Sequence, residues 1–203
     1  MVKIQVNSQG KAYLTTGGKA LVASSGGSKY GADTNTFLGD VNASGVLQLP
    51  TEQSDLVFTG VKDVADYGLY YRFTRTKVKS ASFPSLTTIS GGNACYYMLQ
   101  NCTALTSVSF PNLTTISGAQ ACGYMLQYCT ALTDVYFSAL TTTSFGSRVN
   151  QFYGMMGGTG TNVTHTLHFP SNLESTIQGL QGYPTFGGTS GYVVCAFDLP
   201  ATS

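Results

Sequence analysis

The fold is decided by two adjacent stretches of sequence that are near copies of each other. Residues 83–109 read FPSLTTISGGNACYYMLQNCTALTSVS, and residues 110–136 read FPNLTTISGAQACGYMLQYCTALTDVY. The copies differ at seven of their 27 positions, so 20 positions are identical. A period of this length is typical of a solenoid, in which each unit buries its apolar side chains only against its neighbours. We therefore expect a stacked array with its function on an exposed surface.

The phenylalanine that opens each copy extends the repeat in both directions. It recurs as Phe58, Phe83, Phe110, Phe137 and Phe169. The intervals from 58 to 83 and from 137 to 169 are 25 and 32 residues, so these outer units deviate from the 27-residue period. Terminal repeats usually deviate because one face meets solvent or a cap. The sequence therefore predicts about four coils, two clean and two degraded.

Within each coil the pattern predicts two strands and a helix. Leu105, Val108 and Phe110 alternate with serines, as in a short strand that points its apolar side chains inward. The following NLTTI reads as a second extended segment. Apolar residues then recur at spacings of one, three, one and three, which is typical of one face of a short helix: Ala121, Cys122, Met125, Leu126 and Cys129. The predicted fold class is α/β and β-rich, with strand–strand–helix coils.

The order of these segments resembles the BspA-like leucine-rich repeats. The resemblance is carried by FPNLTTIS, by YMLQYCTAL at residues 124–132 and by YMLQNCTAL at residues 97–105. It covers roughly residues 56–180 and implies a leucine-rich-repeat solenoid. Members of that family are bacterial surface adhesins and, in bacteriophages, tail or receptor-binding parts. The resemblance therefore also implies contact with other macromolecules.

The segments that flank the array are expected to attach it and to cap it. Residues 1–25 contain VKIQV, KAYL and KALVA and read as a small β meander for attachment or oligomerisation. Residues 24–35 have the composition of a Gly/Ser linker. The repeat domain is expected at residues 36–203, with a hairpin cap at 36–50 and a capping strand, GYVVCAFDL, at 191–199.

Charged side chains are scarce. They make up 9% of the chain, against about a quarter in an average protein, and the net charge is +1. Asp134 is the one charged residue between Ser80 and Ser147. Such a surface gives no general attraction to nucleic acid or to an anionic membrane, and no segment is long and apolar enough for membrane insertion. Hydroxyl, amide and aromatic groups suit contact with carbohydrate or protein, although Ser and Thr are also simply tolerated at exposed strand positions.

The five cysteines indicate packing. Cys95 and Cys122 are 27 residues apart, as are Cys102 and Cys129, so each pair occupies equivalent positions in neighbouring coils. We expect small buried thiols, with Cys195 left over. Disulfides between coils would require Cα atoms within about 7 Å, whereas packed helices lie about 8–10 Å apart. Short ligand spacing is missing from the Cys and His pairs, so neither a metal nor a cofactor is expected.

Catalytic signals are weak. His165 and His168 could be placed beside Asp134 or Asp198, but the sequence context of an activated nucleophile is missing. GGTGT at residues 157–161 lacks the lysine of a phosphate-binding loop. We therefore expect a protein that is not an enzyme.

Positions that differ between the two clean copies are not required by the stack and are candidates for binding. Aligned on the phenylalanine, the outward strand positions give a predicted ligand-contact face of Ser107, Ser109, Asp134, Tyr136 and His168. Tyr136 would offer a large amphipathic ring with few torsions to freeze. The alternative is an ordinary exposed strand face. Tyr96 and Tyr128, on the helix side, are the second candidate surface.

The expected function is recognition. A bacterial adhesin needs an export route, and MVKIQVNSQG lacks the apolar run of a signal peptide, whereas a phage particle assembled in the host cytoplasm needs none. We expect a virion component, such as a tail fibre or receptor-binding protein, that contacts a host-surface glycan or protein. Residues 1–25 would join it to other virion proteins or to further copies of the chain. The alternatives are an extracellular leucine-rich-repeat adhesin on a bacterial cell surface and an architectural decoration of the virion.

Overall fold

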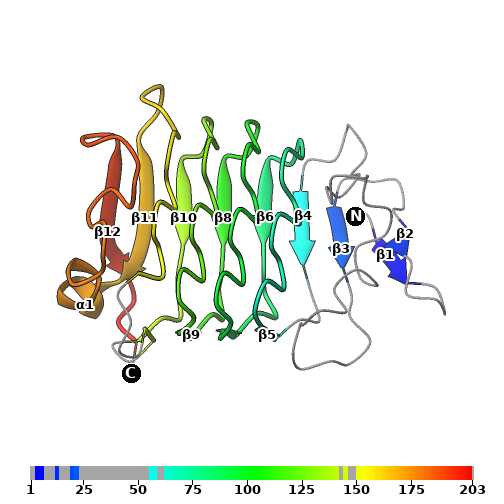
Figure 1. Ribbon diagram of the computed structural model, residues 1–203, viewed down its shortest axis with the longest axis horizontal. Helices are drawn as coiled ribbons and strands as arrows, with labels where there is room; N and C mark the ends of the chain where they lie inside the picture. Colours follow the sequence, from blue (N-terminus) through cyan, green and yellow to red (C-terminus); the bar gives the residue numbers. More distant parts are fainter. Residues whose placement is uncertain are drawn as a thin grey trace.

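The protein is a β-rich solenoid of about five turns with little helix (Figure 1). The computed structural model describes residues 62–141, 144–145 and 150–202, together with the strands at 3–6, 12–13, 19–22 and 55–58. The sequence predicts four coils, and the difference lies at the C-terminal end, where the chain makes one more turn after Phe169. The solenoid character predicted from the repeat is confirmed.

One wall of the solenoid is a nine-stranded sheet. Its spatial order is β12-β11-β10-β8-β6-β4-β3-β1-β2. From β3 to β12 all neighbours pair in parallel, so each turn of the chain adds one strand beside the previous one. In chain order the strands are β1 (Lys3–Val6), β2 (Ala12–Tyr13), β3 (Lys19–Val22), β4 (Asp55–Phe58), β6 (Ser80–Ser82), β8 (Ser107–Ser109), β10 (Asp134–Tyr136), β11 (His165–Pro170) and β12 (Val193–Leu199).

The register of this sheet follows the sequence repeat. Ala81, Val108, Val135 and Leu167 are successive partners across four strands, and all of them are buried. The residues on either side of them in each strand face outward, because side chains alternate along a strand. The inward and outward positions predicted from the alternating pattern are confirmed here.

A second wall is a parallel sheet of three short strands. Val64, Ile89 and Ile116 occupy equivalent positions in it and are fully buried. The strands are β5 (Asp63–Val64), β7 (Thr88–Ile89) and β9 (Thr115–Ile116). The second strand predicted within a coil is thus present in the three coils that contain β5, β7 and β9.

The third wall differs from the prediction of a helix in each coil. In the described part of the chain, helix is confined to the last turn, at η2 (Ser171–Leu173) and α1 (Glu174–Gln178). The corresponding segments of the earlier coils are successive tight turns in which every fourth residue has a positive φ, as at Asn93 (53°), Tyr97 (57°) and Asn101 (59°). None of the described helices has the length and apolar character needed to cross a membrane.

Two kinds of backbone hydrogen bond alternate along these turns. The N–H groups of Tyr96 and Met98 donate to carbonyls three residues earlier in their own coil. The N–H of Tyr97 donates instead to Gly123 O of the next coil (3.1 Å), and that of Leu99 donates to Met125 O (2.9 Å). The turn wall is therefore joined from coil to coil, as a sheet is, and satisfies its own buried backbone groups.

The reason for the wrong prediction lies in the period of the apolar residues. Burial in this wall recurs every four residues, with the pairs Ala94–Cys95 and Met98–Leu99 followed by Cys102. A helix has 3.6 residues per turn, and over nine residues the two periods select the same side chains. Positive φ is uncommon for residues other than glycine and asparagine, so tyrosines at these positions give no signal in the sequence.

The N-terminal strands do not form the meander predicted for residues 1–25. β1 is antiparallel to β2 but parallel to β3, and β3 pairs in parallel with β4. These strands therefore extend the main sheet. The linker expected at 24–35 and the hairpin cap expected at 36–50 lie outside the described residues. At the other end of the sheet, β12 is the edge strand.

A column of stacked phenylalanine rings runs through the core. The ring centroids of Phe83, Phe110, Phe137 and Phe169 are separated by 5.0, 5.3 and 5.4 Å, and adjacent rings are within 13° of parallel. All four are fully buried. Phe197 continues the column at 6.0 Å from Phe169, which marks the additional turn. The alignment predicted for these residues is confirmed.

The cysteines of the array are free thiols within this core. Cys95, Cys102, Cys122 and Cys129 are fully buried. The thiol of Cys102 donates to Phe73 O at 3.0 Å, and burial raises the pKa of Cys102 to about 11. A thiol with such a pKa stays protonated at neutral pH and is unreactive. The buried-thiol prediction is confirmed, and Cys195 is also free.

Two glycines mark the places where neighbouring coils touch through their backbones. A Cβ atom added to Gly118 would lie 1.9 Å from Gly91 O, and one added to Gly91 would lie 2.0 Å from Asp66 N. Gly92 stands next to this contact, but a Cβ atom there would approach nothing closer than Asp66 Oδ1 at 3.7 Å.

We predict that Gly118→Ala destabilises the protein and Gly92→Ala does not. The first substitution forces two coils apart, at a cost of at least about 1–3 kcal/mol, whereas the second should change stability by less than about 0.5 kcal/mol. Urea unfolding followed by circular dichroism measures both. Equal midpoints for the two variants would contradict the close approach of the coils.

Candidate functional site

A polar and aromatic cluster lies on the outer face of the main sheet, across its last three strands. It consists of Asp134 and Tyr136 on β10, His168 on β11 and Asp198 on β12, and we refer to it as the sheet-face cluster. The parallel register places Tyr136 beside His168. Asp134 shares this face because it is two residues before Tyr136 in the same strand.

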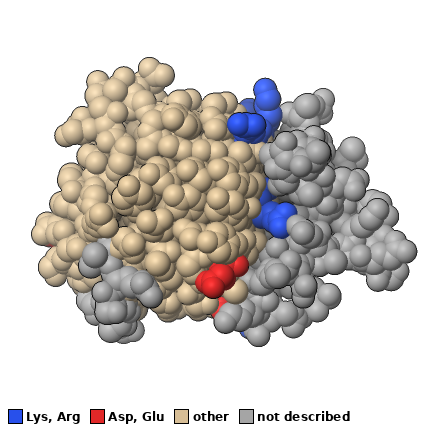
Figure 2. All heavy atoms as spheres, in the orientation of Figure 1, with Lys and Arg blue, Asp and Glu red and all other residues tan. Residues whose placement is uncertain are grey.

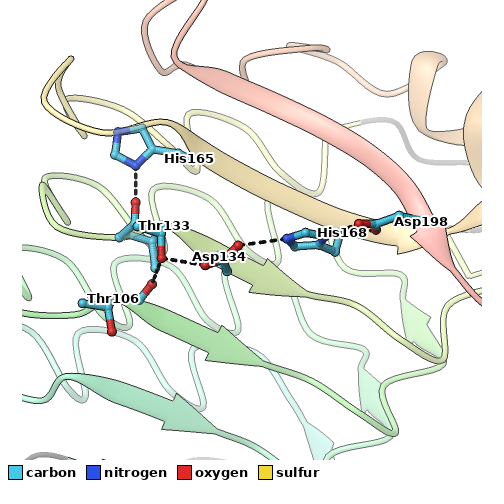
Figure 3. A network of polar contacts seen from close by, with 7 residues as sticks. Thr106, Thr133, Asp134, His165, His168 and Asp198 are labelled. Atoms are coloured by element: carbon cyan, nitrogen blue, oxygen red, sulfur yellow. Dashed lines mark hydrogen bonds and ion pairs between the residues drawn. The ribbon is translucent and has the colours of Figure 1, made fainter.

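His168 is the centre of the cluster. Its Nε2 lies 3.0 Å from Asp134 Oδ1, and its Nδ1 lies 2.9 Å from Asp198 Oδ2. The ring of Tyr136 stacks on the imidazole, with centroids 4.5 Å apart and planes within 10°. One imidazole thus joins three strands, as Figure 3 shows for the two carboxylates.

The charges of the cluster shift the pKa values of its members. Partial burial alone would lower the pKa of His168, but hydrogen bonds and charge from Asp134 and Asp198 outweigh it and raise that pKa. Burial would likewise raise the pKa of Asp134, but the Thr133 hydroxyl (2.6 Å) and His168 lower it. The ion pair is therefore favoured in the folded protein.

This arrangement favours binding over general-base chemistry. Each ring nitrogen of His168 lies within 3.0 Å of a carboxylate oxygen, so neither nitrogen is free to face a ligand. The side chain of Asp198 remains 54% exposed and can accept hydrogen bonds from a ligand, beside the flat ring of Tyr136. Among the described residues, no set of three or more His, Cys, Asp or Glu side chains is arranged to hold a metal ion.

The structure brings together Asp134, Tyr136 and His168 of the predicted contact face. Ser107 and Ser109 are the register partners of Asp134 and Tyr136 on β8, one strand away from the histidine. The Ser109 hydroxyl donates to Ser82 Oγ at 3.0 Å, toward the preceding coil. The two serines therefore flank the cluster.

Asp198 is the member of the cluster that the repeat pattern missed. The units aligned on the phenylalanines end at Phe169, and in the structure the partner of His168 on β12 is Ala196. Asp198 lies two residues after Ala196 and therefore on the same face of β12, and its carboxylate oxygen Oδ2 lies 2.9 Å from His168 Nδ1.

His165, the other histidine, lies apart from the cluster. It is three residues from His168 on β11 and faces the core, where it is fully buried. Its Nδ1 contacts the carbonyl oxygen of Leu132, and its Nε2 has no hydrogen-bond partner. It cannot act together with the sheet-face cluster.

The second predicted surface, Tyr96 and Tyr128, lies on the turn wall. Tyr96 belongs to a set of contacting rings that sequence comparison found only in part: Tyr67, Tyr70, Tyr71, Tyr96, Tyr97, Tyr124 and Tyr153. We call these the turn-face tyrosines. Tyr128 is a separate, 45% exposed ring against Gly158 of the next turn. Tyr97 and Tyr124 were not predicted as surface candidates because they occupy the same position in the two copies, and only positions that differ were selected.

Charge is distributed unevenly over the molecule. On the face shown in Figure 2, the Lys, Arg, Asp and Glu side chains of the described residues gather at the end next to the first coil. The rest of that face is almost free of them. Contacts made there would depend on hydroxyl, amide and aromatic groups.

We predict that His168→Gln lowers stability in a pH-dependent manner. The raised pKa of His168 gives a stabilising contribution that is complete below the unfolded value of about 6.5 and is lost as the pH rises through the folded pKa. The lowered pKa of Asp134 gives a contribution that is present above about 3.9 and is lost as the pH falls through its folded pKa.

The unfolding temperature of the variant should therefore fall furthest below that of the unmodified protein near pH 5–6, by a few degrees for a loss of about 1 kcal/mol. The difference should shrink toward pH 9. Thermal unfolding over this pH range measures it, and a difference that does not vary with pH would contradict the ion pair.

The chain was compared with known proteins in three ways. A scan against protein-family models found no match, and searches of curated proteins and of solved structures found none either. The geometry of the sheet-face cluster and the turn wall therefore carries the functional interpretation.

Proposed function

We propose that the protein is a non-enzymatic recognition protein that binds a host-surface glycan or protein through the sheet-face cluster. The observation that carries this proposal is the Tyr136–His168 stack, fixed by Asp134 and Asp198 on the outer face of the sheet. We further propose that it serves in a phage particle as a tail-fibre or receptor-binding component.

The form of the solenoid supports a binding surface. The outward residues of β6, β8 and β10 are only partly buried, so solvent reaches this face. A parallel sheet usually has both faces covered, and an accessible face is available to a partner. Its position on strands, and not on loops, keeps the cluster rigid.

The chemistry of the cluster suits a polar partner of low charge. Tyr136 contributes a flat amphipathic ring that is already held in place by stacking, so little side-chain entropy is lost on binding. His168 offsets part of the charge of the two carboxylates. A ligand that supplies hydroxyl or amide donors to Asp198 would satisfy this face better than an anion would.

We also propose that the chain is a BspA-like leucine-rich-repeat protein. Support comes from the position of the motifs in the two clean copies: the Phe-Pro steps at Phe83 and Phe110 follow β6 and β8 of the main sheet, and Leu-Thr-x-Ile of the second copy ends in β9. The Cys-Thr-x-Leu segment then leads back to the sheet at β10. In this proposal residues 1–25 contact other virion proteins.

Substitution of Tyr136 tests the proposed function. We predict that Tyr136→Ala reduces binding to host cells, or to the best ligand on a glycan or protein array, by at least about tenfold, as expected for a central aromatic contact. Tyr67→Ala serves as the matched control because Tyr67 is 58% exposed and belongs to the turn wall. Equal binding by the two variants would reject the sheet-face cluster as the recognition site.

A further inference from the structure

A pocket of about 400 Å³ opens on the turn wall near its C-terminal end. Its side chains come from two neighbouring turns and from the segment after α1: Tyr124, Gln127, Tyr153 and Gln181. Four glycines complete the lining, among them Gly154 and Gly157. The volume is within the range of roughly 300–1,000 Å³ that is usual for small-molecule sites. We refer to it as the turn-face pocket.

The pocket begins where the column of stacked tyrosines ends. Tyr71, Tyr97 and Tyr124 occupy equivalent positions in three turns, and their ring centroids are 4.6 and 5.3 Å apart. The next turn has Gly154 at this position, with φ of +61°. A Cβ atom on Gly154 would lie 2.5 Å from Tyr124 Cε1, so the Tyr124 ring rests directly against the backbone of Gly154. Because glycine has no side chain, no fourth ring continues the column.

The two aromatic rings of the pocket form a corner. Tyr124 and Tyr153 have centroids 5.5 Å apart and planes at 87°. A flat ligand can therefore stack on one ring while its edge meets the other. An aromatic corner of this kind holds a ring-shaped ligand with an apolar face.

The polar groups of the pocket are amides. Gln127 Oε1 accepts a hydrogen bond of 2.6 Å from Gln100 Nε2, which fixes the orientation of its amide. Gln127 Nε2 then lies on the side of Gly157, where a Cβ atom would be 3.4 Å away from it. Gln181 supplies a second amide from an exposed position. Each amide can both donate and accept hydrogen bonds.

None of the described residues that line the pocket carries a charge. An anionic ligand would find no counter-charge, and a purely apolar one would leave the two amides unsatisfied. A pyranose ring is neutral and has both an apolar C–H face for the tyrosine rings and a rim of hydroxyl groups for the amides. We propose that the turn-face pocket binds a neutral sugar unit of a glycan.

This inference deepens the proposed function and rests on it only for the source of the glycan, which would be the host surface. The pocket and the sheet-face cluster use different walls of the solenoid and share no residue. Sugar binding at the pocket can therefore be measured independently of cell binding.

Saturation-transfer NMR with the full chain tests the proposal. The probes are the methyl glycosides of glucose, galactose, mannose and N-acetylglucosamine, with glucuronic acid as the charged comparison. The chain has no Trp, so quenching of tyrosine fluorescence gives a second readout. We expect at least one neutral glycoside to bind with a Kd near the millimolar range that is typical of small polar ligands, and glucuronic acid to bind at least tenfold more weakly.

Two variants locate the site. Tyr153→Ala removes one ring of the corner, and Gln181→Ala removes an exposed amide at no risk to the core. We expect each to weaken binding of the neutral glycoside by about fivefold or more, while Tyr67→Ala, which removes an exposed ring that lines neither the pocket nor the sheet-face cluster, leaves it unchanged. Unaltered far-ultraviolet circular dichroism of Gln181→Ala shows that the fold is intact.

Three results would overturn the pocket proposal: no transfer to any neutral glycoside, equal binding of glucuronic acid, or unchanged binding by both pocket variants. Cell binding that is lost in Tyr136→Ala, together with any of these, leaves the proposed function standing. A third outcome is that Gln181→Ala abolishes sugar binding and Tyr136→Ala leaves cell binding intact. That outcome supports the pocket and rejects the sheet-face cluster as the recognition site.

Discussion

Parallel pairing of successive coils, with equivalent residues side by side, is the constraint on which the structure depends. Strands in a sheet stand about 4.7–4.9 Å apart, and this distance is imposed on every column of side chains. The phenylalanine rings, at 5.0–5.4 Å, stack nearly parallel because flat rings fit that interval. The contact between Gly91 and Gly118 belongs to the same constraint, since a side chain there would hold two coils apart.

Much of this architecture could be predicted from the repeat. The 27-residue period gives the columns, and alternation in the strands gives the inward positions of Val108 and Val135. The repeat also brings Tyr136, Asp134 and His168 to one face of the sheet, because the columns of equivalent residues continue into the longer fourth unit. These features follow from spacing alone, and spacing is what a sequence records directly.

The features that could not be predicted depend on backbone conformation. A four-residue turn period and a helix bury the same residues over so short a segment, so the turn wall was indistinguishable from a helix. Tyrosines such as Tyr97 adopt positive φ because the hydrogen bonds to the next coil hold them there, and no local preference indicates it. Asp198 was missed for another reason, because its strand, β12, lies beyond the units that the repeat aligns. The turn-face pocket, built from segments far apart in the sequence, also depends on the tertiary structure.

The near identity of the two central coils has a consequence for how the molecule could change in length. Residues 83–109 and 110–136 differ at only seven positions, so the two coils contact their neighbours through nearly the same side chains. A duplicated coil inserted between them would therefore make the same contacts on both of its sides. It would lengthen the solenoid by about 4.8 Å, the spacing of one strand. Genetic duplication of this single segment offers a route by which related proteins could differ in reach while keeping both ends unchanged.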